Sequence, residues 1–224
     1  MAKGAPAPPD EGEPERVAEA AQALGLRYAV ITSVTRDDLP DGGADHFART
    51  IRAIREASPG TKVEALVPDF GGVEASLAIV LEARPDVLNH NLETTESLYP
   101  KIRRPRQNYR RSLALLASAR QRGARTKSGL MIGLGEAEAD ILQAIADLRL
   151  AGCSLLTLGQ YLQPGAAHPP VEKYYAPAEF DAFRAKALEM GFEEVAAGPL
   201  VRSSFEADRL YETVQEKEGR SCVT

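Results

Sequence analysis

The sequence predicts an α/β fold built on a parallel sheet, because short apolar runs alternate with longer segments of helical periodicity. The apolar runs are Arg27–Val34, Lys62–Val67, Asp86–Leu88, Thr126–Ile132 and Leu155–Leu158. Polar residues and glycines follow each of these runs directly. In a β/α barrel the chemistry gathers at the carboxyl ends of the strands, so this placement predicts a functional site at that edge of the sheet.

The composition is that of a soluble globular chain. Its 224 residues suffice for one sizeable domain, and 44% hydrophobic with 26% charged residues is ordinary for such a domain. The formal net charge of −5 argues against general nucleic-acid binding. No apolar run approaches membrane-spanning length and no secretory signal is visible, so we expect a cytoplasmic protein without a membrane partner.

Helices are expected between the strands because apolar residues recur there at helical spacing and a glycine or proline follows each segment. The expected helices with their stop signals are Pro14–Leu24 before Gly25, Asp45–Ala57 before Ser58-Pro59-Gly60, Val73–Ala83 before Pro85, Tyr109–Arg122 before Gly123, Ala137–Leu150 before Gly152 and Pro177–Met190 before Gly191. Glu194–Ala197 adds a short strand, and Ser204–Lys217 a terminal helix. The predicted organisation is a loop over 1–13, the α/β barrel-like region over 14–203, and a helix with a tail over 204–224.

The polar residues after the third apolar run form one candidate binding group. Asn91 and Glu93 stand two residues apart, so strand alternation would place both on one face. Asparagine offers a donor and an acceptor, and ionised glutamate accepts hydrogen bonds from hydroxyls. The pair suits the polar groups of a ribose or an amino acid, while its spacing alone fits strand-end residues that cap loops equally well.

Glycines after the fourth and first runs form two further candidates. Gly133 and Gly135 would let the backbone approach a flat ligand closely, although two glycines before a helix are common. Glu136 next to them also fits a first-turn carboxylate favoured by the helix dipole. Gly42 and Gly43 fit a plain turn as well as a ligand loop.

The cysteines and histidines do not form a metal-binding pattern. The chain contains two cysteines, and Cys153 lies between an expected helix and strand, where a small buried side chain is expected. Cys222 lies in a polar tail. A cubane iron–sulfur cluster usually needs three or four thiolates, which these two cannot supply. The histidines show no metal-ligand spacing; they are His46, His90 and His168.

Several of these segments together resemble lipoyl synthase, a family of radical S-adenosylmethionine enzymes. The matching motifs are Arg36–Gly43 (RDDLPDGG), Asn89–Thr94 (NHNLET), Thr126–Glu136 (TKSGLMIGLGE), Gly159–Pro164 (GQYLQP) and Gly198–Ser204 (GPLVRSS). They occur in the order and at the spacing of the family. The resemblance extends from about Ala2 to about Tyr211, which is nearly the whole chain.

The resemblance implies a partial parallel β/α barrel of the radical S-adenosylmethionine type. The family also carries two cysteine triplets upstream of the matching region, each binding a 4Fe-4S cluster, whereas this chain contains only Cys153 and Cys222. It therefore resembles a family member that begins after its last cluster cysteine and lacks the first barrel strand. In relatives a Val-Ala-x-Gly segment stands where Met1-Ala2-Lys3-Gly4 stands here, so one hypothesis is an upstream start with a GTG valine codon read as Met.

The family chemistry implied by the resemblance is sulfur insertion in lipoate biosynthesis. A 5′-deoxyadenosyl radical formed from S-adenosylmethionine removes hydrogens at C6 and C8 of a protein-bound octanoyl chain, and an auxiliary 4Fe-4S cluster supplies both sulfur atoms. The implied partners are octanoylated lipoyl carrier domains, of the glycine cleavage H protein or 2-oxoacid dehydrogenase E2 type, and an electron donor such as ferredoxin or flavodoxin.

The resemblance also assigns residues to ligands. Gly42 and Gly43 would lie near the methionyl amine of S-adenosylmethionine. Asn91 and Glu93 would bind its polar groups, and Gly133 and Gly135 would lie beside its adenine. The family uses a serine of the Arg202-Ser203-Ser204 motif as a ligand of the auxiliary cluster, which points to Ser204 first and Ser203 second. Serine at this position also fits a helix N-cap. The tyrosine that usually follows is Phe205 here, so a hydroxyl is lost at that place.

The segment Lys101–Arg111 is basic within an acidic chain. A solvated basic loop and a docking site for an acidic carrier domain both fit this pattern. For the whole chain the rival hypotheses are an enzyme with an upstream start, a cluster-free, non-catalytic barrel fragment that binds S-adenosylmethionine or lipoyl carrier domains, and an unrelated cluster-free β/α-barrel enzyme.

Overall fold

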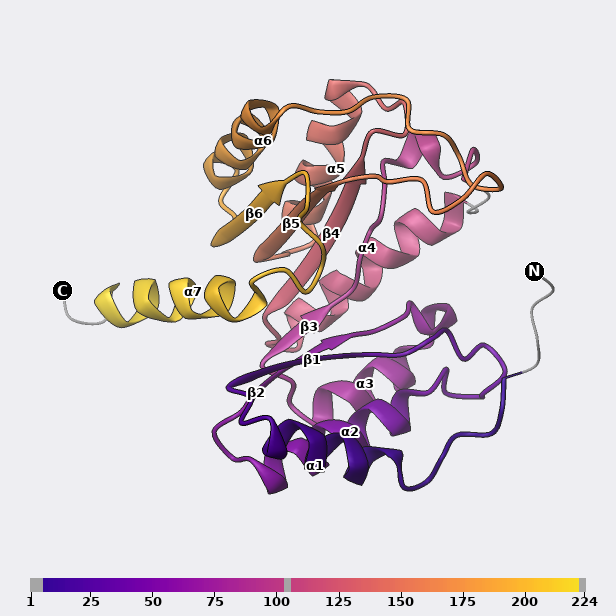
Figure 1. Ribbon diagram of the computed structural model, residues 1–224, viewed down its shortest axis with the longest axis vertical. Helices are drawn as coiled ribbons and strands as arrows, with labels where there is room; N and C mark the ends of the chain where they lie inside the picture. Colours follow the sequence, from indigo (N-terminus) through magenta and orange to yellow (C-terminus); the bar gives the residue numbers. More distant parts are fainter. Residues whose placement is uncertain (1–5, 103–105, 222–224) are drawn as a thin grey trace. The chain divides into compact units, whose positions relative to one another are not determined.

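The computed structural model describes residues 6–102 and 106–221 (Figure 1). Its strands lie in one open sheet in the order β1-β2-β3-β4-β5-β6. They are β1 Tyr28–Thr32, β2 Lys62–Leu66, β3 Val87–Asn89, β4 Thr126–Ile132, β5 Leu155–Gln160 and β6 Glu194–Gly198. The helices are α1 Glu13–Ala23, α2 Ala44–Ala57, α3 Glu74–Glu82, α4 Arg106–Gln121, α5 Glu138–Leu150, α6 Pro177–Glu189 and α7 Ala207–Ser221, with short 3₁₀ turns at Phe70–Gly72 and Glu96–Leu98. The predicted α/β fold with a parallel sheet is confirmed, including its short last strand.

The chain divides into two compact units, Met1–Leu88 and Asn89–Thr224, and each is described by itself. In the first unit β1 pairs in parallel with β2, in the register Tyr28↔Lys62 to Thr32↔Leu66. Helix α2 packs against both α1 and α3. It buries Ala44, Ala48, Ile51 and Ile54, which recur at helical spacing and therefore form one apolar face.

The second unit is built around β4, β5 and β6, which lie side by side in Figure 1. Every residue of β5 is buried, as expected for a parallel strand covered on both faces. The core cluster draws on β4, β5, β6 and on α4, α5 and α6; its large buried members include Leu116, Leu130, Ile145, Leu156, Phe180 and Val195. This packing fixes the strand ends on which the candidate site residues stand.

Helix α7 is held to the start of β6 by both apolar and charged contacts. Its residues Leu210 and Val214 are buried. The Glu194 carboxylate receives Lys217 Nζ at 3.0 Å and Arg184 Nη2 at 2.9 Å. Burial tends to raise the pKa of Glu194, but the hydrogen bonds from Lys217, the Val195 N–H and Arg184 outweigh it, so this pKa lies below its ordinary value.

Among the described helices, none combines the length and the apolar character that crossing a membrane requires.

Candidate functional site

The glycine turn of the first unit forms the start of α2. Gly43 is the N-cap residue in a left-handed conformation, with φ 87°, and Gly42 has φ 63°. The Asp41 carboxylate accepts hydrogen bonds from the N–H of Gly43 at 3.0 Å and of Asp45 at 2.8 Å. A Cβ on Gly42 would lie 3.1 Å from the Phe70 ring. These contacts explain the glycines by the turn itself, and their ligand role stays a prediction.

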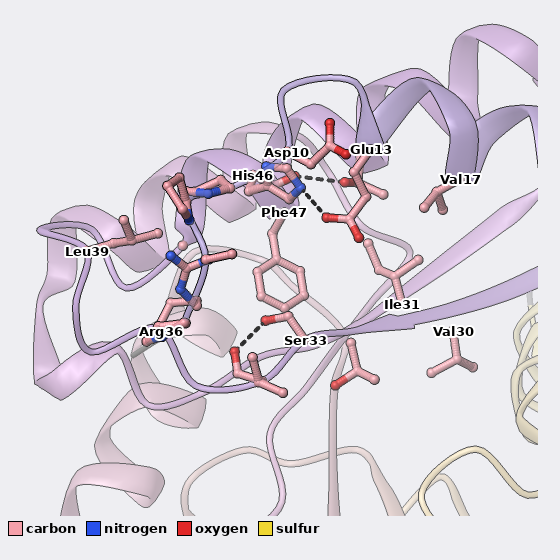
Figure 2. A pocket seen from close by; sticks show the side chains of 18 residues that line it. Asp10, Glu13, Val17, Val30, Ile31, Ser33, Arg36, Leu39, His46 and Phe47 are labelled. Carbon is pink, nitrogen blue, oxygen red and sulfur yellow. Dashed lines mark hydrogen bonds and ion pairs between the residues drawn. The ribbon is translucent and has the colours of Figure 1, made fainter. Parts of the chain in front are cut away.

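A cavity of about 700 Å³ lies next to this turn within the first unit (Figure 2). Gly43 and Phe47 of the α2 region line it together with Ile31 of β1. The charged groups at its wall are paired: His46 Nε2 lies 2.8 Å from Glu13 Oε2, and Arg36 forms two hydrogen bonds with Asp38. The volume suits a small molecule, and the lining combines apolar and charged groups.

In the second unit, Asn91 and Glu93 lie beyond the end of β3, which stops at Asn89. The prediction that alternation on one strand aligns their side chains is wrong, because Glu93 adopts a left-handed conformation with φ 73°. The segment nevertheless stays paired with β4: the Glu93 N–H donates to the Gly129 carbonyl at 2.9 Å, and the Met131 N–H donates to the Glu93 carbonyl at 2.8 Å. Strand β4 therefore positions Glu93 through its backbone.

Asn91 is also linked to the serine motif. The Ser203 hydroxyl donates a hydrogen bond to Asn91 Oδ1 at 2.9 Å, although 112 residues separate the two in sequence. Asn91 Oδ1 occupies the space above Gly129, where an added Cβ would lie 2.8 Å from it. The structure thus brings together two of the segments that the sequence singled out.

The turn Gly133–Glu136 closes on itself. The buried Glu136 carboxylate accepts hydrogen bonds from the N–H of Gly133 at 2.5 Å and of Leu134 at 2.9 Å. The interpretation of Glu136 as a first-turn helix carboxylate is wrong, because α5 begins only at Glu138. Gly133 has φ 111°, a conformation that side chains rarely adopt.

The segment Glu172–Tyr175 lies across this turn. The Glu172 N–H donates to the Gly133 carbonyl at 2.8 Å, and the Tyr175 hydroxyl lies 3.4 Å from Glu136 Oε1. Burial, followed by the charge of Glu136, raises the pKa of Tyr175 to about 12. The hydroxyl therefore stays protonated and acts as a donor at neutral pH.

Gln160, from the GQYLQP motif, holds the same segment to the end of β5. Its Nε2 donates to the carbonyls of Tyr161 and Lys173, each at 3.0 Å, and its Oε1 accepts from the Tyr175 N–H at 3.0 Å. Sequence reasoning did not identify Tyr175 as part of the site. No motif marks it, because its position depends on a loop that returns from the sequence beyond β5.

Ser204 lies in the turn before α7, and its side chain is exposed. The N-cap interpretation is wrong, because α7 begins at Ala207. Ser203 is partly buried through its contact with Asn91. The adjacent hydroxyls therefore have different environments, one inside the strand-end cluster and one open to solvent.

The residues that begin β4 are structural. Lys127 and Ser128 are both buried, and Ser128 Oγ accepts a hydrogen bond from the Leu92 N–H at 3.1 Å. His90, which precedes Asn91, is also buried, with Nε2 2.8 Å from the Ser112 hydroxyl.

The described residues do not fit an iron–sulfur cluster. Cys153 is fully buried between α5 and β5, and burial raises the pKa of its thiol to about 12. A cluster ligand must be a thiolate, which this environment disfavours. Cys222 lies outside the described residues. Over residues 6–102 and 106–221, no group of three or more His, Cys, Asp and Glu side chains is arranged to hold a metal ion.

Part of the basic segment Lys101–Arg111 lies outside the described residues, namely 103–105. At its end, Arg110 forms a bidentate ion pair with Glu96, at 3.1 and 2.8 Å, and lies over the Tyr109 ring. The Tyr109 hydroxyl donates to Asp147 at 2.8 Å. Some of the positive charge is thus already neutralised within the chain, while Lys101 is exposed.

Comparison with known proteins yields consistent matches. The profile of the Radical SAM superfamily matches residues 2–148. The chain is 55% identical over 204 residues to a lipoyl synthase of Thermus thermophilus, covering 90% of this chain and 63% of that protein. It is 51% identical over 212 residues to a lipoyl synthase of Chlorobaculum tepidum, covering 94% of this chain and 72% of the relative. The chain therefore spans about two thirds of the length of these relatives.

Solved structures agree on the fold. A methylornithine synthase superposes with a TM-score of 0.59 at 14% identity, covering 96% of this chain and 73% of that one. A hydroxymethylglutaryl-CoA lyase from Pseudomonas aeruginosa superposes with a TM-score of 0.56 at 17% identity, covering 96% and 68%. At these identities the likeness concerns the β/α architecture alone.

Proposed function

The chain belongs to the lipoyl synthase family of the Radical SAM superfamily, and on this premise we propose that it carries the S-adenosylmethionine-binding strand ends of a sulfur-inserting enzyme. The observation that carries the proposal is the convergence of three family motifs in the second unit. Ser203 bonds to Asn91, whose Oδ1 lies over Gly129 of β4, and the Gly133–Glu136 turn follows the carboxyl end of the same strand. This is the edge at which β/α folds bind their ligands.

The donor set fits the proposed ligand. Asn91 uses its Oδ1 toward Ser203, while its Nδ2 group has no hydrogen-bond partner among the described residues. Such an amide can donate to a ribose hydroxyl or to the methionyl carboxylate. Glu93, two residues further on, would accept hydrogen bonds from hydroxyls of the ligand. The backbone of Gly133 and Gly135 would lie against its adenine. The assignment of the Gly42 and Gly43 backbone to the methionyl amine stays a prediction from the resemblance.

When bound, S-adenosylmethionine supplies the 5′-deoxyadenosyl group that abstracts hydrogen in this superfamily. The residues of this chain bind and orient the cofactor, and the buried Glu136 holds the Gly133–Glu136 turn in one conformation. Since the described residues do not fit a 4Fe-4S cluster, we derive no step that involves iron from them. The exposed Ser204 hydroxyl is proposed as one oxygen ligand of the auxiliary cluster. A single serine cannot hold such a cluster without further ligands.

The proposed substrate is an octanoyl chain on a lipoyl carrier domain, and the product carries sulfur at C6 and C8. The exposed Lys101 and the neighbouring basic residues would attract an acidic carrier domain. The glycine cleavage H protein and 2-oxoacid dehydrogenase E2 domains are the proposed carriers, and ferredoxin or flavodoxin the proposed electron donor. A non-catalytic chain that only binds S-adenosylmethionine or carrier domains is the alternative.

Titration of the full chain with S-adenosylmethionine by isothermal calorimetry or NMR tests the site. We expect weak binding, with a Kd well above the micromolar range, because the iron that anchors the methionyl group in the superfamily has no fitting ligand set here. Asn91→Ala should reduce this binding further. The control Gln143→Ala removes an amide from an exposed position of α5 and should leave it unchanged. Equal binding by both variants would refute the assignment of Asn91.

A further inference from the structure

The hydrogen bond between Ser203 and Asn91 joins two segments that serve different purposes in the proposed function. Asn91 is the proposed cofactor ligand, and Ser203 belongs to the motif proposed for the auxiliary cluster. The Ser203 hydroxyl lies 2.9 Å from Asn91 Oδ1. A serine hydroxyl has one proton, so donating to this oxygen commits that proton to Asn91.

Two glycines on neighbouring strands make room for this contact. On β4, a Cβ at Gly129 would lie 2.8 Å from both Asn91 Oδ1 and Thr157 Oγ1. On β5, a Cβ at Gly159 would lie 2.2 Å from the Val201 carbonyl oxygen. Asn91 and the segment that contains Ser203 are therefore both seated directly on the sheet, where larger residues would push them away.

The segment before Ser203 is anchored independently of Asn91. Val201 is 6% exposed, and its N–H donates to the Gly198 carbonyl at 3.1 Å. The position of the Ser203 hydroxyl is thus set by β6 and by the burial of Val201. A hydroxyl fixed in this way can select one orientation of the asparagine amide rather than follow it.

We propose that Ser203 is a positioning residue for Asn91, which is a role that rests on the proposed function of the site. By accepting from Ser203, Asn91 Oδ1 is held over Gly129, and Nδ2 is turned toward the open strand-end edge as the donor for S-adenosylmethionine. Ser204 has no such role, because its side chain is exposed in the next position of the turn. The two serines of the motif therefore have different proposed roles: Ser203 orients the Asn91 amide, and Ser204 is the proposed ligand of the auxiliary cluster.

The expected effect follows from the worth of one neutral hydrogen bond. Losing it lets the amide sample other orientations, so binding of S-adenosylmethionine should weaken about 2- to 10-fold. We would titrate the ¹⁵N-labelled full chain with S-adenosylmethionine and follow the Asn91 side-chain NH₂ signals. The variants are Ser203→Ala, Ser203→Thr, which retains the hydroxyl, Asn91→Ala, and Gln143→Ala on the exposed face of α5 as the control.

The proposal requires that Ser203→Ala shifts the Asn91 NH₂ signals in the free protein and weakens binding, that Ser203→Thr restores both, and that Gln143→Ala changes neither. If Asn91→Ala loses binding while Ser203→Ala binds like the wild type, the site stands and the positioning role is overturned. If Gln143→Ala matches Ser203→Ala, the role is overturned too. If Asn91→Ala binds like the wild type, or the wild type does not bind, the proposed site itself is wrong.

Discussion

Replacing Gly133 by alanine tests whether the packing of the strand-end turn depends on the absence of a side chain. The residue has φ 111°, and a Cβ would lie 2.2 Å from Gln160 Nε2 and 2.5 Å from the Lys173 carbonyl oxygen. The side chain of Gln160 can move, but it would then give up its hydrogen bonds to the Glu172–Tyr175 segment. The Lys173 carbonyl is backbone and can move only if that segment shifts.

The expected loss in the free energy of unfolding of Gly133→Ala has two parts. A left-handed conformation costs alanine about 1–2 kcal/mol, and forcing an extra carbon into a packed site costs about 1–3 kcal/mol. Gly133→Ala should therefore lower the free energy of unfolding by about 2–5 kcal/mol. Gly123→Ala isolates the first part, because Gly123 has φ 86° and nothing lies within 4 Å of its Cβ position.

Urea unfolding followed by circular dichroism measures both variants against the wild type. We expect Gly123→Ala to lose about 1–2 kcal/mol and Gly133→Ala to lose clearly more. Double substitution with Gln160→Ala should recover little, since the Lys173 carbonyl remains in place. If Gly133→Ala loses no more than Gly123→Ala, the contact with Gln160 and Lys173 does not limit this position and the reasoning fails.

Three further outcomes are expected. The folded-state pKa of Glu194 lies below its ordinary value of 4.5, so its carboxylate stabilises the fold above pH 4.5, and this stabilisation is lost as the pH falls through the lowered pKa. The difference in unfolding free energy between the wild type and Glu194→Gln should therefore vanish in acid. A difference that persists in acid would contradict the ion pairs. Cys153, with its pKa raised to about 12, should resist iodoacetamide at pH 8 in the native chain and react in urea, as read by peptide mass spectrometry; rapid native labelling would refute its burial. Lys101→Glu should weaken binding of an acidic octanoylated carrier domain more than Arg52→Glu on α2, and equal effects would argue for net charge rather than a docking segment.

Much of the fold could be predicted from sequence because its signals are local. Each expected strand and helix lies where the structure has one. Glycines such as Gly123 and Gly152 come directly after the last turns of α4 and α5, and their positive φ values suit that position. Within α4, the residues Leu115, Leu116 and Ala119 are buried, as expected for a helix with one apolar face. The division of the chain at Leu88 has no such local signal, since it depends on which elements pack together.

The candidate site was harder to predict because it depends on backbone conformation and on distant contacts. Glu93 leaves the regular strand at a positive φ, which a non-glycine residue seldom does and which no periodicity reveals. The N-cap role expected for Ser204 assumed that α7 begins three residues earlier than it does. The bond from Ser203 to Asn91 joins residues 112 apart in sequence, and it forms where Asn91 lies over Gly129 of β4 and the Val201 backbone lies over Gly159 of the neighbouring β5.

The motif glycines acquire a different meaning once the structure is considered. From sequence they suggest an open cradle in which a ligand takes the place of missing side chains. In the structure, protein atoms already fill that space: the Phe70 ring at Gly42, Gln160 and Lys173 at Gly133, and Glu172 at Gly135. The glycines thus let the chain pack on itself and hold the turns in shape. A ligand at this edge would therefore bind to the side-chain and backbone groups that these turns present, and the Asn91 amide, which bonds to Ser203, is the donor that we propose for it.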